Sequence, residues 1–377
     1  MIIRSRAPVR IDFAGGWTDV ALFCQETPGY VVNAAINLYS YVTVTTPPMA
    51  KITNGINIYD ADLEQYVEAD DIRALEYSRP FPSGNPDFPT PFYGTADLAK
   101  AAVKLFGGRG VRTQTRGLEG IDLETYSIAP PGSGLGTSAA MGVALCGALG
   151  RAAGKNWLPF EYAEMACRIE QEELGILGGK QDQYASALGG FNVMEFNGDK
   201  VTTNRLPLRK EIIYELEANL LLCYTGTSRL SGNIHQQVVA AFRAGENVDT
   251  IETLKDMAKA MQYELMAGHW SACAAIIEAN WRLQQKLHPA ITTPEMIQIY
   301  VLARRYGATA GKACGAGGGG CMVFYCPGTK PKVRKKLQVE GIQVIDFTFN
   351  DTGLQVWEVS TPPPPLSGGY HNANLYH

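Results

Sequence analysis

Apolar and polar residues alternate along two segments near the N-terminus, and apolar residues recur with helical spacing in the segments that follow. Residues 2–16 and 39–46 show the period of two that is typical of half-buried strands. Farther along, apolar positions recur at i, i+3, i+4 and i+7, as on one face of an amphipathic helix. The pattern therefore predicts two strands, a later strand-like segment at 189–201, and helices at 95–106, 137–149 and 160–175.

The second half of the chain shows a different order of patterns. A strand-like segment at 216–226 leads into long helical patterns at 251–287 and 294–306. A glycine cluster at 315–320 then precedes an apolar strand pattern, a basic helical pattern and a final strand-like segment at 344–353. Helices and strands are thus mixed in both halves of the chain.

The length of the chain predicts more than one domain. At 377 residues it exceeds what one hydrophobic core usually fills. We predict an N-terminal domain over residues 1–200 and a C-terminal domain over residues 201–360. The proline-rich segment 78–94 is predicted to be irregular and on the surface, and residues 361–377 to form a poorly ordered tail.

Composition and charge narrow the class of protein. The chain is 46% apolar and 19% charged, as in ordinary soluble enzymes, and its net charge of −4 argues against a nucleic-acid partner. No apolar run reaches the roughly 18 residues of a membrane helix, and the N-terminus lacks the apolar core of a signal peptide. The eight scattered cysteines read as reduced core thiols. We expect a cytoplasmic protein without a membrane partner, compatible with a homodimer.

The stretch from Pro130 to Gly150 carries the first candidate chemistry. Gly132, Gly134 and Gly136 precede a helical pattern, and a glycine loop at a helix N-terminus presents N–H groups to phosphate. The Walker pattern fails because no Lys follows Gly136, and the dinucleotide pattern fails in its spacing and in its acidic residue.

A third phosphate-loop pattern matches at nearly every position. The stretch resembles the Pro-x-Gly-x-Gly-Leu-Gly-Ser-Ser-Ala loop of the GHMP small-molecule kinases, with Thr137 in place of the first Ser. The resemblance implies an α+β fold with an N-terminal domain like ribosomal protein S5 domain 2, a ferredoxin-like C-terminal domain and an active site in the cleft between them. It also implies ATP as co-substrate, bound by Pro131, Gly132, Ser133, Gly134, Leu135, Gly136, Thr137 and Ser138.

The segment 169–190 supplies acidic residues for magnesium and for the acceptor hydroxyl. On a helical wheel Glu170 lies at one edge of the apolar stripe and Glu173 nearer its centre, so geometry alone leaves both eligible. The segment resembles the acidic motif of GHMP sugar kinases, in which a Glu precedes the catalytic Asp by this spacing. The resemblance selects Glu170 and Ser138 as Mg²⁺ ligands and Asp182 as the catalytic carboxylate.

The N-terminal segment 7–19 resembles the first motif of the same family. Its Gly-Gly-x-Thr-Asp variant is similar to heptose-phosphate kinases and fucokinases, whereas galactokinases carry Gly-Glu-His there. By position, Gly16 and Asp19 should contact the sugar, and Arg10 should face the reaction centre. A buried pair between Arg10 and Asp182 would help to keep the aspartate ionised.

The third family motif spans 311–324, and its Gly315, Gly317 and Gly318 are expected near the phosphates. Segments around Lys180 and Arg229 resemble kinases that phosphorylate the anomeric hydroxyl of D-glycero-D-manno-heptose 7-phosphate in nucleotide-heptose synthesis. Lys180 stands where that group has Trp, and Arg229 is the candidate for the distal phosphate. Two alternatives remain: a kinase for fucose or another unphosphorylated sugar, and a catalytically silent sugar- or nucleotide-binding regulatory protein.

Overall fold

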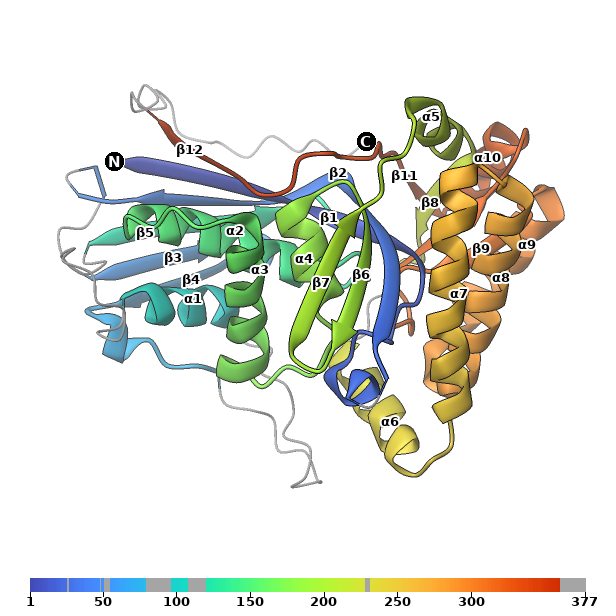
Figure 1. Ribbon diagram of the computed structural model, residues 1–377. Coiled ribbons are helices and arrows are strands. Elements are labelled where there is room, and N and C mark those ends of the chain that lie inside the picture. Colours follow the sequence, from blue (N-terminus) through green and yellow to red (C-terminus); the bar gives the residue numbers. More distant parts are fainter. Residues whose placement is uncertain are drawn as a thin grey trace.

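The computed structural model describes residues 1–25, 27–47, 49–50, 55–78, 96–107, 120–227 and 231–359, without the side chains of residues 231–233. Most of the predicted surface segment 78–94, the predicted tail 361–377 and Arg229 therefore lie outside the described residues. Figure 1 shows two parts side by side, one built on a large sheet and one dominated by long helices.

The large sheet is centred on two long antiparallel strands, β1 (Ile2–Ala14) and β2 (Gly29–Thr45). The later half of β2 pairs with β5 and its first half pairs with β6. The strand order is β12-β1-β2-β5-β3-β4, with β7 added beyond β6. The bounds are β3 Ile56–Asp60, β4 Gln65–Ala69, β5 Ile121–Ser127, β6 Phe191–Asn197, β7 Lys200–Arg205 and β12 Gln355–Val359.

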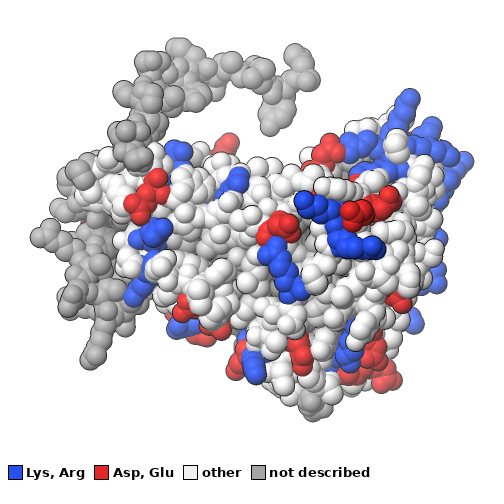
Figure 2. All heavy atoms as spheres, turned by 45° about the horizontal axis from the view of Figure 1, so that its top comes forward, with Lys and Arg blue, Asp and Glu red and all other residues white. Residues whose placement is uncertain are grey.

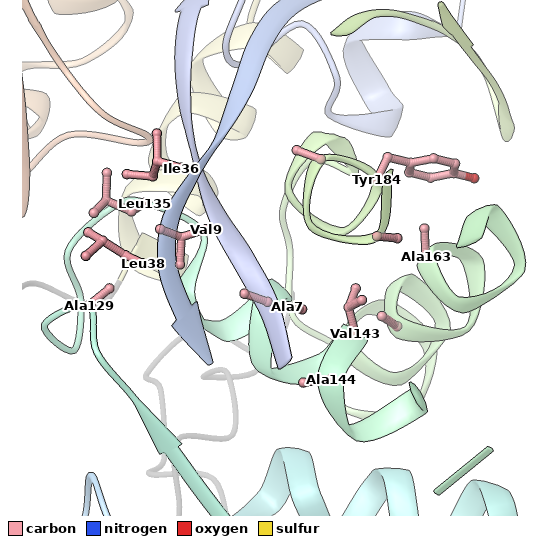
Figure 3. Packing of buried hydrophobic residues seen from close by; sticks show 14 of the residues in the cluster. Ala7, Val9, Ile36, Leu38, Ala129, Leu135, Val143, Ala144, Ala163 and Tyr184 are labelled. Carbon is pink, nitrogen blue, oxygen red and sulfur yellow. The ribbon is translucent and has the colours of Figure 1, made fainter. Parts of the chain in front are cut away.

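Helices cover this sheet and complete the first hydrophobic core. They are α1 (Asp97–Gly107), α2 (Thr137–Ala152), α3 (Pro159–Arg168) and α4 (Gln181–Leu188). Helices α2 and α4 both pack against β1 and β2, which the small side chains of α2 permit because they let the helix approach the sheet closely. Figure 3 shows Leu135, just before α2, beside Val9, Ile36 and Leu38 of the two strands. This contact anchors the glycine loop in the core.

A second sheet of four antiparallel strands lies in the other part, in the order β11-β8-β10-β9. Helix α7 packs on β2 and β1, and α8 packs on both β9 and β1, so these two helices join the parts. The strands are β8 Leu220–Tyr224, β9 Ala310–Ala313, β10 Cys321–Tyr325 and β11 Gln343–Ile345. The helices are α5 Lys210–Asn219, α6 Ser231–Arg243, α7 Val248–Ala267, α8 Trp270–Leu287, α9 Pro294–Tyr306 and α10 Lys330–Val339.

The second half differs from the sequence pattern at several elements, and only Val344 and Ile345 of the predicted strand-like segment 344–353 lie in a strand, β11. The predicted strand 216–226 begins inside α5, which continues to Asn219. The predicted helix 251–287 is two helices, because the chain turns at Gly268 with a φ of 72°. Strand β12, which the pattern did not predict, returns to pair with β1. The boundaries 1–200 and 201–360 remain a prediction, and β12 from the second of these ranges lies in the first sheet.

Basic side chains gather at one end of the face drawn in Figure 2, and the cysteine thiols are buried. On the face shown in Figure 2, Lys and Arg side chains gather at the end of the molecule that carries α10. Val333 and Leu337 of that helix are buried while Lys332, Lys335 and Lys336 are exposed, as on an amphipathic surface helix. All eight cysteines are free and buried, as predicted. No helix in the described part of the chain is long and apolar enough to cross a membrane.

Candidate active site

The glycine loop before α2 has a backbone that side chains would strain. Gly132, Gly134 and Gly136 have φ values of 64°, 71° and 77°, which L-residues rarely adopt. A Cβ atom at Gly134 would lie 2.3 Å from the carbonyl oxygen of Cys314, and one at Gly136 would lie 2.9 Å from the Asp182 carboxylate. Glycine is therefore required at these positions by both conformation and space.

Both sheets hold this loop by backbone hydrogen bonds. The N–H of Arg10 in β1 donates to the oxygen of Leu135 over 2.9 Å, and the N–H of Cys321 in β10 donates to the oxygen of Ser133 over 2.6 Å. The Ser133 hydroxyl also lies 3.0 Å from the Thr137 hydroxyl. The loop is thus fixed where the two parts of the molecule meet.

The start of α2 leaves donors open. Among the described residues, no acceptor is found for the N–H groups of Gly134, Gly136, Thr137 and Ser138. The residue before the helix, Gly136, has no side chain that could cap them. Such N–H groups, together with the positive end of the helix dipole, favour a phosphate group at this point.

Arg10 and Asp182 form a two-point ion pair beside the loop. Arg10 Nε donates to Asp182 Oδ1 over 2.7 Å and Nη2 donates to Oδ2 over 2.8 Å. Nη1 donates to the oxygen of Gly134 over 2.6 Å, so the same guanidinium contacts the loop. Burial is the largest single influence and lowers the pKa of Arg10, but the charges of Asp182 and Asp12 raise it above its usual value. Arg10 therefore stays charged and fixes the orientation of the Asp182 carboxylate.

Glu170 lies in a π turn, Ile169–Glu173, that continues α3. Its Oε1 accepts from the Ser138 hydroxyl over 2.5 Å, and its Oε2 accepts from the Gln183 amide. Burial is the largest influence and raises the pKa of Glu170. The hydrogen bond from Ser138 lowers this pKa and the charge of Asp182 raises it, and the result is a pKa of about 7. The helical wheel placed Glu173 nearer the centre of the apolar stripe, and this placement is wrong. The N–H of Leu174 bonds to the oxygen of Ile169, five residues back, so the turn is wider than in an α-helix. Glu173 is consequently exposed.

The oxygens of Ser138 and Glu170 suit a magnesium ion chemically. Mg²⁺ prefers oxygen ligands and usually binds through one or two protein groups, several waters and substrate phosphates. Within the described part of the chain, His, Cys, Asp and Glu side chains form no cluster of three or more that could hold a metal alone. The pair next to the open N–H groups of α2 therefore fits an ion that is shared with a bound phosphate.

The turn after β1 brings Asp19 toward the same place. Asp19 is buried, and its Oδ2 accepts from the N–H of Gln181 over 3.0 Å. Burial, and next the charge of Asp182, raises the pKa of Asp19 to about 6. A Cβ atom at Gly179 would lie 1.7 Å from Asp19 Oδ2, and one at Gly16 would lie 2.6 Å from Asp12 Oδ2. Small residues on both sides therefore make room for the two carboxylates.

The remaining residues that the sequence predicted for the site differ in whether they face the glycine loop. Gly315 faces the loop, since its Cβ would lie 2.6 Å from the Gly134 oxygen, whereas Gly317 and Gly318 face Ile291 and Ile234. Lys180 precedes α4, and its Nζ donates to Asp199 over 3.4 Å. Arg229 lies outside the described residues.

Sequence reasoning missed several polar residues that the fold brings to this region. Gln181 and Gln183 flank Asp182 and bond Asp19 and Glu170, and their closeness to Asp182 in sequence was a usable signal. Asn280 of α8 accepts from the N–H of Gly15 over 3.0 Å. Asp12 and Lys312 form a buried ion pair that no spacing rule indicates, because 300 residues separate them.

Comparisons with known proteins agree with this geometry. Residues 97–190 match the GHMP kinases N terminal domain and residues 261–342 match the GHMP kinases C terminal domain. The chain is 33% identical over 365 residues to the D-glycero-alpha-D-manno-heptose 7-phosphate kinase of Campylobacter jejuni, covering 95% of this chain and 99% of that one.

Two further relatives extend the comparison. A crystal structure of a D-glycero-D-manno-heptose 1-phosphate kinase from Bacteroides thetaiotaomicron is similar with a TM-score of 0.72 and 27% identity, covering 95% of this chain and 100% of that chain. The bifunctional fucokinase/GDP-fucose pyrophosphorylase of Arabidopsis thaliana is 30% identical over 321 residues, which cover 83% of this chain and 29% of that protein. These matches confirm the fold that the sequence motifs predicted, and the chain belongs to the GHMP kinase family.

Proposed function

We propose that this protein transfers the γ-phosphoryl group of ATP to the anomeric hydroxyl of D-glycero-D-manno-heptose 7-phosphate. The observation that carries the proposal is the similarity to the Campylobacter jejuni heptose 7-phosphate kinase, which extends over nearly the full length of both chains. The relative from Bacteroides thetaiotaomicron is also described as a heptose phosphate kinase. The ion pair of buried Arg10 with half-buried Asp182, beside open N–H groups, supports phosphoryl transfer as the chemistry.

Nucleotide binding is assigned to the loop and the start of α2. The phosphates would accept from the open N–H groups of Gly134, Gly136, Thr137 and Ser138. Mg²⁺, when bound, neutralises charge on the transferring phosphoryl group, and Ser138 and Glu170 would hold it. Gly315 keeps the backbone of the other part close behind this loop.

Asp182 is assigned to the acceptor hydroxyl. Its carboxylate accepts a hydrogen bond from that hydroxyl and takes the proton as the new O–P bond forms and the bond from the γ-phosphorus to the leaving ADP oxygen breaks. The carboxyl group later releases the proton to solvent. Arg10 stays protonated and holds both carboxylate oxygens. A loose transition state demands little of a base, so we assign most of the rate to positioning and to charge neutralisation.

Sugar recognition is assigned to Gly16, Asp19, Lys180 and Arg229. A carboxylate such as Asp19 accepts hydrogen bonds from sugar hydroxyls, and a distal phosphate needs a fixed cation to offset its lost hydration. Arg229 is our first candidate for that cation and Lys180 the second. The Lys180 side chain is 14% exposed and bonded to Asp199, which itself is fully exposed.

ADP release tests the function. Purified protein with Mg²⁺ and ATP should release ADP fastest with heptose 7-phosphate in a panel that includes unphosphorylated heptose, fucose and other hexoses. Fastest release with fucose would favour the second candidate function, which the similarity to the Arabidopsis protein supports. Protein that binds ATP but phosphorylates no sugar in the panel would refute the kinase assignment and leave a binding or regulatory role.

The position of the distal phosphate is tested by Arg229→Ala with two sugars. We expect kcat/KM for heptose 7-phosphate to fall about 10- to 150-fold, or roughly 1.5–3 kcal/mol, as for a hydrogen bond to a charged group. Unphosphorylated heptose should lose little. Equal losses with both sugars would make Arg229 a general structural residue, and no loss with either would direct the same test to Lys180. A cytoplasmic location and a homodimer also stay predictions.

A further inference from the structure

The two parts of the molecule share a buried ion pair at the edge of the candidate site. Lys312 of β9 donates from Nζ to the backbone oxygen of Asp12 over 3.0 Å and also to Asp12 Oδ2. The Lys312 side chain is 0% exposed and that of Asp12 is 3% exposed. The pair therefore joins the second sheet to β1 of the first, with no access to water.

Stability alone does not explain such a pair. Both charges lose their hydration on folding, and a well-packed apolar pair of similar volume is often as stable or more stable. Asp12 Oδ1 is also buried and finds no hydrogen-bond partner among the described residues. The arrangement is costly for the fold, which directs attention to what the pair positions.

Asp12 lies between two elements of the candidate site. It follows Arg10 by two residues in β1, so the two side chains start from the same face of the strand. Its charge contributes to raising the pKa of Arg10. On its other side, the Asp12 carboxylate is so close to Gly16 that a Cβ there would lie 2.6 Å from Oδ2.

Other side chains of the second part hold the same stretch of the first. Asn280 of α8 accepts from the N–H of Gly15 over 3.0 Å. Lys255 of α7 is buried and donates to the backbone oxygens of Phe23 over 3.0 Å and Thr27 over 3.1 Å. Residues from distant parts of the sequence thus hold the chain before the Gly15–Asp19 turn, at Gly15 within it, and at Phe23 and Thr27 after it.

We propose that Lys312 is a positioning residue for the acceptor sugar, acting through Asp12 on the Gly15–Asp19 turn and on Arg10. The inference rests on the proposed function, since it takes the turn to be part of the sugar site. Lys312 touches neither substrate nor Asp182 in this account. It fixes where Asp19 and Arg10 stand when the sugar hydroxyl meets the phosphoryl group.

Lys312→Met tests the proposal in activity. We expect kcat/KM for the sugar to fall roughly 10- to 100-fold, because the sugar-binding turn and Arg10 would be displaced. KM for ATP should stay within about twofold of wild type. Lys100→Met is the matched control, because Lys100 and Asp97 form an equally buried pair within α1. An equal loss of sugar kcat/KM in Lys100→Met, or none in folded Lys312→Met, would overturn the proposal.

Removal of both charges separates positioning from stability. Asp12→Asn combined with Lys312→Met leaves no uncompensated buried charge, so its stability should approach that of the wild type. Its sugar kcat/KM should nevertheless stay as low as that of Lys312→Met. Recovery of wild-type kcat/KM in the double variant would show that only the unpaired charge mattered, against the proposal.

Amide hydrogen exchange tests the positioning without relying on catalysis. A peptide covering residues 13–22 should exchange several-fold faster in Lys312→Met than in wild type or Lys100→Met, while peptides from α2 stay unchanged. If Lys312→Met does not fold, the nearly isosteric Asp12→Asn gives the same measurement. Unchanged exchange in that peptide would refute the proposal, whereas a wild-type protein that phosphorylates no sugar would refute the proposed function instead.

Discussion

Two glycine-rich segments meet at the candidate site, and they use glycine for different reasons. The first is the loop Gly132–Gly136 and the second is the run Gly315–Gly320. Every glycine in both segments has a positive φ, from 64° at Gly132 to 131° at Gly319. In composition and backbone conformation the two segments are therefore alike.

Their N–H groups differ where each segment leads into the next element, α2 or β10. The first segment leads into α2 with donors that have no acceptor among the described residues. In the second, Gly318 donates to Ile291 over 2.7 Å and Gly320 donates to Thr227 over 2.9 Å. A Cβ at Gly317, Gly319 or Gly320 would also lie 2.6–2.7 Å from a backbone oxygen of another segment. Close backbone packing requires glycine in the second segment and at Gly134 of the first, and we propose that the first segment also leaves N–H groups open to an anion.

Asp182→Asn should give the largest effect, because Asp182 lies against the first glycine segment and is assigned to the acceptor hydroxyl. We expect kcat to fall roughly 10²-fold or more while ATP affinity is retained. Steady-state ADP release together with nucleotide titration measures both quantities. Asp256→Asn, an exposed position on α7, is the control and should change neither. A loss of ATP affinity equal to the loss of kcat would place Asp182 with the nucleotide instead.

Ser138→Ala and Glu170→Gln should each raise the Mg²⁺ concentration needed for half-maximal rate. Since even a partner outside the first coordination sphere costs about 10- to 100-fold in metal affinity, we expect roughly tenfold or more here. Titration of the initial rate with Mg²⁺ at saturating ATP measures this. Glu173→Gln, on the same turn but exposed, should leave the requirement unchanged. The reverse pattern would exchange the assignments of Glu170 and Glu173.

A pH profile tests the side of the site that holds the sugar. Because the pKa of Asp19 is raised to about 6, its carboxylate becomes protonated and loses its negative charge as the pH falls below that value. If the ionised group accepts from the sugar, kcat/KM measured at saturating Mg²⁺, which keeps Glu170 ionised, should be level above about pH 7 and fall up to about tenfold per unit below pH 6. Asp19→Asn should be low at every pH and lack this inflection. A profile for Asp19→Asn that matches the wild type would remove Asp19 from the site.

Gly318→Ala should affect the fold more than the reaction. Its φ of 74° disfavours a side chain, and the new Cβ would lie 2.2 Å from Cδ1 of Ile234. We expect the free energy of unfolding to fall by about 1–3 kcal/mol, measured by urea denaturation. In folded protein, kcat should stay within about threefold of wild type. A large loss of ATP affinity without a loss of stability would assign phosphate contact to the second segment as well.

The sequence pattern predicted those elements that are determined by residues close together in the sequence. Period-two alternation located β1, and glycines followed by small residues located the loop and α2. Helical spacing located α9 to the residue, and the structure adds Thr293 as its N-cap and Gly307 just after its end. The family resemblance then added the two-domain fold, which the comparisons confirmed.

Features that depend on distant partners could not be predicted in this way. The pairing of β12 with β1 joins residues 349 to 357 positions apart, and the ion pair of Asp12 with Lys312 spans 300. The π turn at Glu170 changes which side chains face inward, and a wheel drawn for a regular α-helix cannot show that. In α8, Asn280 is a buried polar residue whose partner, Gly15, becomes clear only once the two parts are folded together.

The central claim is that the first glycine segment binds the nucleotide phosphates while the second supports it. Amide hydrogen exchange with and without a non-hydrolysable ATP analogue and Mg²⁺ tests this most directly, because it reads the N–H groups that distinguish the segments. We predict that amides of residues 132–138 become strongly protected, whereas those of Gly318 and Gly320, already bonded to Ile291 and Thr227, change little. Protection of residues 315–320 without protection of residues 132–138 would contradict the account.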